Sequence, residues 1–160
     1  HTLGESFELS CQWTHVSAMC ERVKARLFSE AAKHGFTKDS VWVSFRVTQI
    51  YETGAAIYVY LTLNHKGKDR SKLIEQYEAV EDAARDEVLL AGGCISHHHG
   101  VGKIRKKFME RTVSPNAIEW QQALKEKIDP TNIFAINNTI ARSDAERDLI
   151  RAQNEAKFGR

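Results

Sequence analysis

The segment from Ala56 to Asn64 constrains the fold most, because apolar and polar side chains alternate along its whole length. The odd-numbered residues are aliphatic: Ile57, Val59, Leu61 and Leu63. The even-numbered residues between them carry hydroxyl groups: Tyr58, Tyr60 and Thr62. Successive side chains of a β-strand point to opposite faces, so this pattern predicts a strand with one core face and one polar face.

A second strand and two helices are predicted around this segment. Residues 41–51 alternate in the same way, and Glu52-Thr53-Gly54 forms a turn between the two strands. An amphipathic helix precedes them, capped by Thr14 and ended near Gly35, with its apolar stripe at Val16, Met19, Cys20, Val23 and Leu27. Another follows, capped by Ser71 and ended by Gly92-Gly93, with its stripe at Leu73, Ile74, Tyr77, Val80, Ala84 and Val88. We therefore predict an α+β fold, an antiparallel sheet with helices over one face, in which Val41, Val43, Phe45 and Val47 face the core.

The remainder of the chain has a mostly helical pattern. Helical segments are predicted over 102–112, over 114–128, where Ser114-Pro115 supplies a cap and a first-turn proline, and over 143–157. Residues 129–134 read Asp-Pro-Thr-Asn-Ile-Phe and are predicted to form a loop.

Composition excludes several classes of protein. The 160 residues carry a net charge of +2, which is too small to argue for a nucleic acid or a membrane surface as a partner, and we expect no nucleic acid. No run approaches the roughly 18 apolar residues of a membrane span. The three cysteines show no CxxC spacing and favour a reducing compartment. The chain begins at His1 rather than at methionine, and we expect it to be a piece of a longer polypeptide.

Three adjacent histidines, His97, His98 and His99, lie between glycines in residues 92–103. Imidazoles can transfer protons, form hydrogen bonds or bind metals near neutral pH. Alternate residues of an extended segment share a face, so we expect His97 and His99 to line a cavity and His98 to be structural. Adjacent ligands strain a tetrahedral site, and no cysteine or carboxylate has matching spacing, so we predict no metal site. A His-rich surface loop is the plainer alternative.

The hydroxyl face of the 56–64 strand is the second candidate. Tyr58 and Tyr60 share that face with Thr62, and Arg46 and Thr48 of the companion strand could join them. Strand tyrosines are usually packing residues. A row of polar groups nevertheless favours a polar cavity, in which Arg46 would suit an anionic substrate or form a surface ion pair.

Taken together, five motifs resemble the C-terminal part of the alkyldihydroxyacetonephosphate synthase family, the peroxisomal ether-lipid enzymes among the vanillyl-alcohol-oxidase flavoproteins. They are Leu-Gly-Glu-Ser-Phe-Glu (3–8), Arg-Val-Thr-Gln (46–49), Ile-Tyr-Val-Tyr (57–60), Ser-His-His-His-Gly-Val-Gly-Lys (96–103) and the 129–134 loop. The resemblance runs from about Leu3 to Asn138, and it leaves 139–160 as a charged helical tail of unknown role.

The resemblance implies that FAD is the cofactor and that the acyl group of acyl-dihydroxyacetonephosphate is exchanged for a long-chain fatty alcohol. It assigns catalysis to Tyr58, His97, His98 and His99. Cofactor contacts would come from His97, His98 and Asn137, and substrate contacts from His99, Arg46 and Tyr60. Residues 1–93 would belong to the substrate-binding cap domain and residues 94–138 would complete the FAD-binding domain.

The resemblance also implies a homodimer, peripheral membrane association and a peroxisomal location, although the chain ends Phe-Gly-Arg without a Ser-Lys-Leu-type signal. The rest of the flavin site would lie upstream of His1, so this piece alone should not be active. Two alternatives stay open: a related FAD-dependent hydroxyacid oxidase or dehydrogenase, and a non-catalytic metal-binding module.

Overall fold

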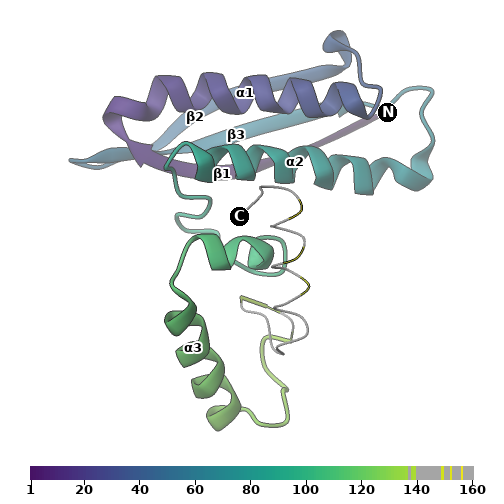
Figure 1. The fold of residues 1–160 in the computed structure, drawn as a ribbon. Coiled ribbons are helices and arrows are strands. Elements are labelled where there is room, and N and C mark those ends of the chain that lie inside the picture. The colour runs from purple at the N-terminus through teal and green to yellow at the C-terminus, as the bar shows by residue number, and fades with distance from the viewer. Residues whose placement is uncertain (137, 140–148, 150–151, 153–155, 157–160) are drawn as a thin grey trace. The chain divides into compact units, whose positions relative to one another are not determined.

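The structure is a computed structural model that describes residues 1–136, 138–139, 149, 152 and 156. It divides into two compact units, His1–His99 and Gly100–Arg160, each described by itself below (Figure 1). The described helices include none that combines the length and the apolar character required to cross a membrane.

The first unit is a three-stranded antiparallel sheet with two helices. Along the chain its elements are β1 (Thr2–Gln12), α1 (Val16–Lys33), β2 (Val41–Ile50), β3 (Gly54–Asn64) and α2 (Leu73–Leu90). The strand order is β1-β3-β2, so β3 is central and pairs with both neighbours. The helices α1 and α2 run side by side over one face of this sheet (Figure 1). The predicted α+β architecture is confirmed.

The core lies between that face of the sheet and the two helices. The four aliphatic residues predicted for the buried face of β3 are each at most 1% exposed. They meet an apolar stripe of α1 made of Met19, Val23, Leu27 and Ala31. Burial of such side chains is the main force that holds a half-buried sheet to its helices.

The strand β1 was not predicted. Phe7 and Leu9 are buried on its helix side, but serines, a glycine and glutamates surround them, so the apolar alternation is short. Pairing along the whole length of β3, from Thr2 opposite Asn64 to Gln12 opposite Gly54, stabilises this strand instead. Tertiary pairing therefore decided a segment whose local pattern is weak.

The caps and two apolar positions differ from prediction. Thr14 lies in a 3-10 turn (Trp13–His15), and no side chain caps α1. Asp69, not Ser71, accepts the capping hydrogen bond, from the Ser71 amide, at a 3-10 turn (Arg70–Lys72) before α2. Ile74 and Val47 are 68% and 46% exposed, so neither contributes to the core.

A β-bulge changes which face of the sheet the residues near the end of β2 occupy. The pairing places Val47 opposite Ile57, but the next paired residue is Gln49, opposite Ala56. Thr48 is thus the extra residue, and it donates a hydrogen bond from Oγ1 to the Ala56 carbonyl at 3.3 Å. One inserted residue reverses the alternation beyond it, which moves Gln49 onto the sheet face that carries Tyr58.

The second unit contains a 3-10 segment (Lys106–Arg111) and α3 (Pro115–Ile128). The helix predicted over 102–112 is therefore a shorter 3-10 turn. The start of α3 is confirmed, because Ser114 Oγ accepts the Ala117 amide at 3.3 Å and Pro115 occupies the first turn. The helix predicted over 143–157 and the predicted cofactor residue Asn137 lie outside the described residues.

Candidate active site

The backbone after α2 carries the histidine run to the open face of the sheet. Cys94 pairs with Ser10 at the edge of β1, through N–H to carbonyl hydrogen bonds of 2.8 and 2.9 Å. Gly93 makes this approach possible, since a Cβ there would lie 2.7 Å from Met19 Cε and 2.9 Å from Val88 Cγ1. Residues 97–99, the histidine loop, follow directly.

The carboxylate of Glu8 anchors the histidine loop. Its Oε1 atom accepts the backbone amides of His97, His98 and His99 at 2.7, 2.8 and 2.7 Å. Glu8 is only 1% exposed, and burial raises its pKa, but the three amides outweigh burial and lower the pKa to about 2. Glu8 is therefore a carboxylate anion at neutral pH.

The hydroxyl of Tyr58 lies between two imidazoles of the histidine loop. The Nε2 atoms of His98 and His99 are 2.7 and 3.0 Å from Tyr58 Oη. Glu8 and Tyr58 are direct partners in the pairing of β1 with β3, so both side chains lie on the face opposite the helices. The structure thus brings together Tyr58 and two of the three predicted histidines.

The imidazole of His97 has different partners. Its Nε2 atom lies 2.5 Å from Gln49 Oε1 and 2.5 Å from the Tyr51 hydroxyl. The prediction that His97 and His99 line one cavity while His98 is structural is wrong, because His98 and His99 are the two that contact Tyr58. The three amides converge on one oxygen and the backbone bends at residues 97–99, so the alternation of an extended segment does not apply.

The predicted substrate residues lie on the same sheet face. Arg46 is exposed and is the cross-strand partner of Tyr58 on β2. Tyr60 is half-buried, and its ring centroid is 6.2 Å from that of Tyr58. A polar face with a cation beside a hydrogen-bonded tyrosine is suited to an anionic substrate that undergoes proton transfer.

Sequence reasoning missed three residues of this site: Glu8, Gln49 and Tyr51. A glutamate between the apolar pair Phe7 and Leu9 was the one available signal for Glu8. Gln49 reaches the site only because of the bulge, which the sequence pattern did not indicate.

The same cluster offers a possible metal-ligand set. One ligand atom each from Glu8, His98 and His99 lies within 4.8 Å of the others, so the argument from sequence spacing was incomplete. However, His98 Nδ1 and Glu8 Oε2 are only 2.8 Å apart. Two ligands of a tetrahedral zinc, each about 2.0–2.1 Å from the ion, lie roughly 3.3 Å apart. The shorter distance is that of a direct contact between the imidazole and the carboxylate, with no ion between them.

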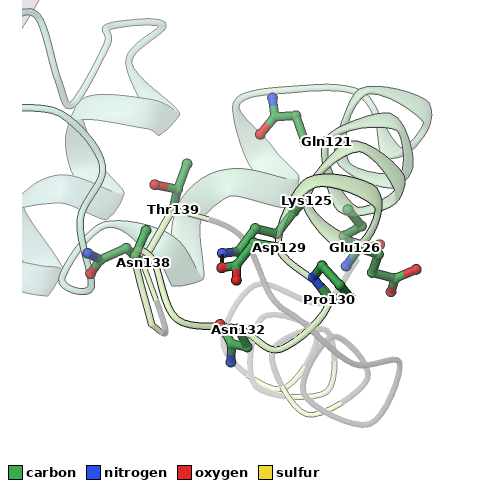
Figure 2. Close-up of a pocket in the computed structure, with 10 residues that line it drawn as sticks. Gln121, Lys125, Glu126, Asp129, Pro130, Asn132, Asn138 and Thr139 are labelled. Atoms are coloured by element: carbon green, nitrogen blue, oxygen red, sulfur yellow. Dashed lines mark hydrogen bonds and ion pairs between the residues drawn. The ribbon is translucent and has the colours of Figure 1, made fainter.

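The second unit has a pocket of its own, with a volume of about 330 Å³, beside α3 and the loop that follows it (Figure 2). The carboxylate of Asp129 accepts the amides of Ile133 and Phe134, each at 2.9 Å, and pairs with Lys125. The hydrogen bond from Lys125, followed by these amides, lowers the pKa of Asp129 to about 2. The Asp129 carboxylate thus holds the loop through these contacts. We take the cluster of Tyr58, Glu8 and the histidine loop in the first unit as the candidate active site.

Comparisons with known proteins show which family the chain resembles. Residues 1–137 match the family described as FAD linked oxidases, C-terminal domain. The chain is 46% identical over 138 residues to an alkyldihydroxyacetonephosphate synthase of Caenorhabditis elegans, which covers 86% of the chain and 23% of that protein. It is 30% identical over 93 residues to the synthase of the same name from Dictyostelium discoideum, covering 58% of the chain and 15% of that protein.

A solved structure supports the fold. An alkyldihydroxyacetonephosphate synthase crystal structure superimposes with a TM-score of 0.53 at 15% identity, over 89% of this chain and 21% of that one. The chain thus spans less than a quarter of the length of the relatives that it matches. The resemblance drawn from the motifs is confirmed, and the chain belongs to the FAD linked oxidases, C-terminal domain family.

Proposed function

We propose that this chain is the C-terminal part of a flavin-dependent alkyldihydroxyacetonephosphate synthase. Such an enzyme exchanges the acyl group of acyl-dihydroxyacetonephosphate for a long-chain fatty alcohol. The observation that carries the proposal is the Tyr58 hydroxyl, held by His98 and His99, in a chain 46% identical over 138 residues to a synthase of this name. A tyrosine held in this way can move a proton to and from a substrate carbon.

The exposed imidazoles of the histidine loop fit a flavin as a neighbour. His98 and His99 are 42% and 32% exposed, on the same side of the sheet as Tyr58, so polar ring atoms face outward from this chain. His97 is engaged by Gln49 and Tyr51, so its contribution is to hold the loop. Bound FAD would supply the redox-active ring next to which the substrate carbon reacts.

Substrate recognition follows from the charge and the hydroxyl groups around Tyr58. Arg46 would pair with the phosphate of the substrate, because a guanidinium binds phosphate oxygens through two parallel hydrogen bonds. Tyr60 would border the same space. Tyr58 would then transfer the proton at the substrate carbon while His98 and His99 hold its hydroxyl.

The wider assignment is part of the same proposal. Residues 1–93 would belong to the substrate-binding domain, residues 94–138 would complete the FAD-binding domain, and 139–160 would form a tail. The rest of the polypeptide would supply the remaining flavin contacts. A homodimer, peripheral membrane association and a peroxisomal location are inferred from the family; light scattering, vesicle flotation and imaging of the tagged full-length protein test them.

The first experiment is an absorbance spectrum of the full-length protein. A flavin spectrum that bleaches anaerobically with acyl-dihydroxyacetonephosphate and recovers with fatty alcohol supports the proposal. A flavin that ignores this substrate but is reduced by a hydroxyacid indicates the related oxidase or dehydrogenase. Absence of flavin, with stoichiometric zinc in the purified protein, indicates the metal-binding module and overturns the proposal.

A further inference from the structure

The hydroxyl of Tyr58 has two imidazole neighbours but only one proton. An O–H group donates one hydrogen bond, so it cannot donate to the Nε2 atoms of both His98 and His99, at 2.7 and 3.0 Å. At most one imidazole can accept this proton at a bare Nε2, so at least one must donate an Nε2–H to the tyrosine oxygen. When the tyrosine proton is used in this contact, the two histidines differ in protonation at Nε2.

The second carboxylate oxygen of Glu8 decides which histidine is the acceptor. Oε2 is buried, it has no hydrogen-bond partner among the described residues, and it lies 2.8 Å from His98 Nδ1. The corresponding contact of His99 is longer, since its Nδ1 is 4.0 Å from Oε1. A buried anion next to His98 Nδ1 holds a proton there and leaves the Nε2 of the same ring bare.

We propose that Glu8 is a positioning residue that makes His98 the proton acceptor of Tyr58. Glu8 stabilises the Nδ1–H form of His98, so Tyr58 donates to His98 Nε2 and accepts a hydrogen bond from His99 Nε2–H. The proposal rests on the proposed function for the reaction that uses this proton path, but its tautomer assignment does not depend on the substrate.

The proton transfer balances within these groups. The O–H bond of Tyr58 breaks, its electron pair stays on oxygen, and a new N–H bond forms at His98 Nε2. The resulting imidazolium carries protons on both nitrogens next to the Glu8 anion, and the tyrosinate oxygen keeps the hydrogen bond from His99. After the tyrosinate has taken a proton from the substrate carbon and has given that proton back, return of the His98 Nε2 proton to the tyrosinate restores the starting state.

Several titratable or charged groups lie near this path. Among the described residues of the first unit, those that face Tyr58 or Glu8 are Arg46 from β2, Tyr60 from β3, and His97, His98 and His99 from the loop. The ring of His97 is engaged by Gln49 and Tyr51. A pH effect of altering Glu8 therefore reports on His98 and His99.

The test compares the Glu8→Gln variant with wild type in the full-length protein. The glutamine oxygen can still accept the loop amides, while its NH₂ group replaces Oε2 and donates to His98 Nδ1. His98 then carries its proton on Nε2 instead of Nδ1, so Tyr58 has no bare nitrogen of His98 to which it can donate. We expect kcat to fall about a hundredfold, the scale of a lost proton-transfer group, while KM and FAD content change little. The lost charge should also weaken the anchor of the histidine loop.

The pH profile separates positioning from a purely structural role. The acid limb of kcat should differ from that of wild type in Glu8→Gln, because the anion that lies 2.8 Å from His98 Nδ1 is lost. Glu8→Asp keeps the charge and should keep the acid limb near its wild-type position. The matched control is Glu5→Gln on the same strand, where the exposed side chain carries the same charge change and should leave kcat and its profile unaltered.

A readout that does not depend on activity is ¹⁵N NMR of the histidine-labelled protein, in which protonated and bare ring nitrogens give separate resonances. Glu8→Gln should exchange the protonated nitrogen of one histidine. An unaltered tautomer pattern with kcat within threefold of wild type overturns the inference. A uniform loss of rate with FAD lost and the acid limb unmoved makes Glu8 structural and also overturns it. A wild-type protein without exchange activity overturns the proposed function instead.

Discussion

Two buried carboxylates each hold a loop in this chain, Glu8 in the first unit and Asp129 in the second. Each accepts consecutive backbone amides, and each has a pKa lowered to about 2. The difference is the distance along the chain. Glu8 anchors residues 89 to 91 positions away, whereas Asp129 anchors residues four and five positions away.

This difference in distance along the chain distinguishes the Glu8 anchor, which assembles the candidate active site, from the Asp129 anchor, which holds a local turn. Asp129 and its amides come from one short segment, so the loop forms wherever that segment folds. Glu8 joins a strand to a loop that arrives after α2, and the same contact places His98 and His99 on Tyr58. A long-range anchor can thus assemble groups from separate elements, which a local anchor cannot.

The largest expected effect is on the stability of the anchored loops. Glu8→Ala removes the acceptor of three amides, and we expect local opening of residues 97–99 to become easier by roughly 4 kcal/mol. Asp129→Ala should loosen only residues 133–134, and by less, because two amides rather than three lose their acceptor and both residues are exposed. Hydrogen exchange measured on peptides from both loops checks this. Equal effects of both variants, or an effect of Glu8→Ala on residues 133–134, would break the comparison.

Acid should weaken the Glu8 anchor next most strongly. The pKa of Glu8 is about 2 in the folded protein against an ordinary value of 4.5. Its stabilisation is therefore complete above pH 4.5 and is lost as the pH falls towards 2, by an amount on the order of 3 kcal/mol. Protection factors of residues 97–99, corrected for intrinsic exchange, should show this loss in wild type and not in Glu8→Gln. A flat wild-type profile down to pH 2 would contradict it.

Replacing Tyr58 tests whether the contact that Glu8 creates between the histidine loop and Tyr58 is needed for turnover. Tyr58→Phe removes the hydroxyl between His98 and His99, and turnover of the full-length enzyme should fall at least about a hundredfold with FAD still bound. Tyr51→Phe is the matched control, because its hydroxyl contacts His97 and not Tyr58. We expect that variant to lose less than about tenfold. Near-normal turnover of Tyr58→Phe would remove this residue from the mechanism.

The smallest expected effect distinguishes the histidines themselves. His99→Ala removes one hydrogen-bond partner of Tyr58 and should lower kcat by roughly tenfold or more, with little change in the melting temperature. His97→Ala should have a weaker effect on kcat, since His97 holds the loop to Gln49 and Tyr51. Paired measurements of kcat and melting temperature check both variants. A His99→Ala protein that fails to fold would make the histidine loop structural.

The sequence by itself determined the parts of the fold whose patterns are local. The alternation of β3, the stripe of α1 and the Ser114-Pro115 start of α3 can be read from nearby residues, because strand and helix periods act over a few positions. The motifs also showed a resemblance to one flavoprotein family, and the comparisons confirm that resemblance.

Only the tertiary structure decided how the candidate site is assembled. Strand β1 depends on pairing with β3, Gln49 reaches its place through a bulge, and Glu8 meets the histidine loop across some ninety positions. No local period records such contacts, because each depends on free energy gained only when distant segments are already together. Tyr58 and the histidines could therefore be proposed as site residues from the sequence, whereas the carboxylate of Glu8 that anchors the histidine loop could not.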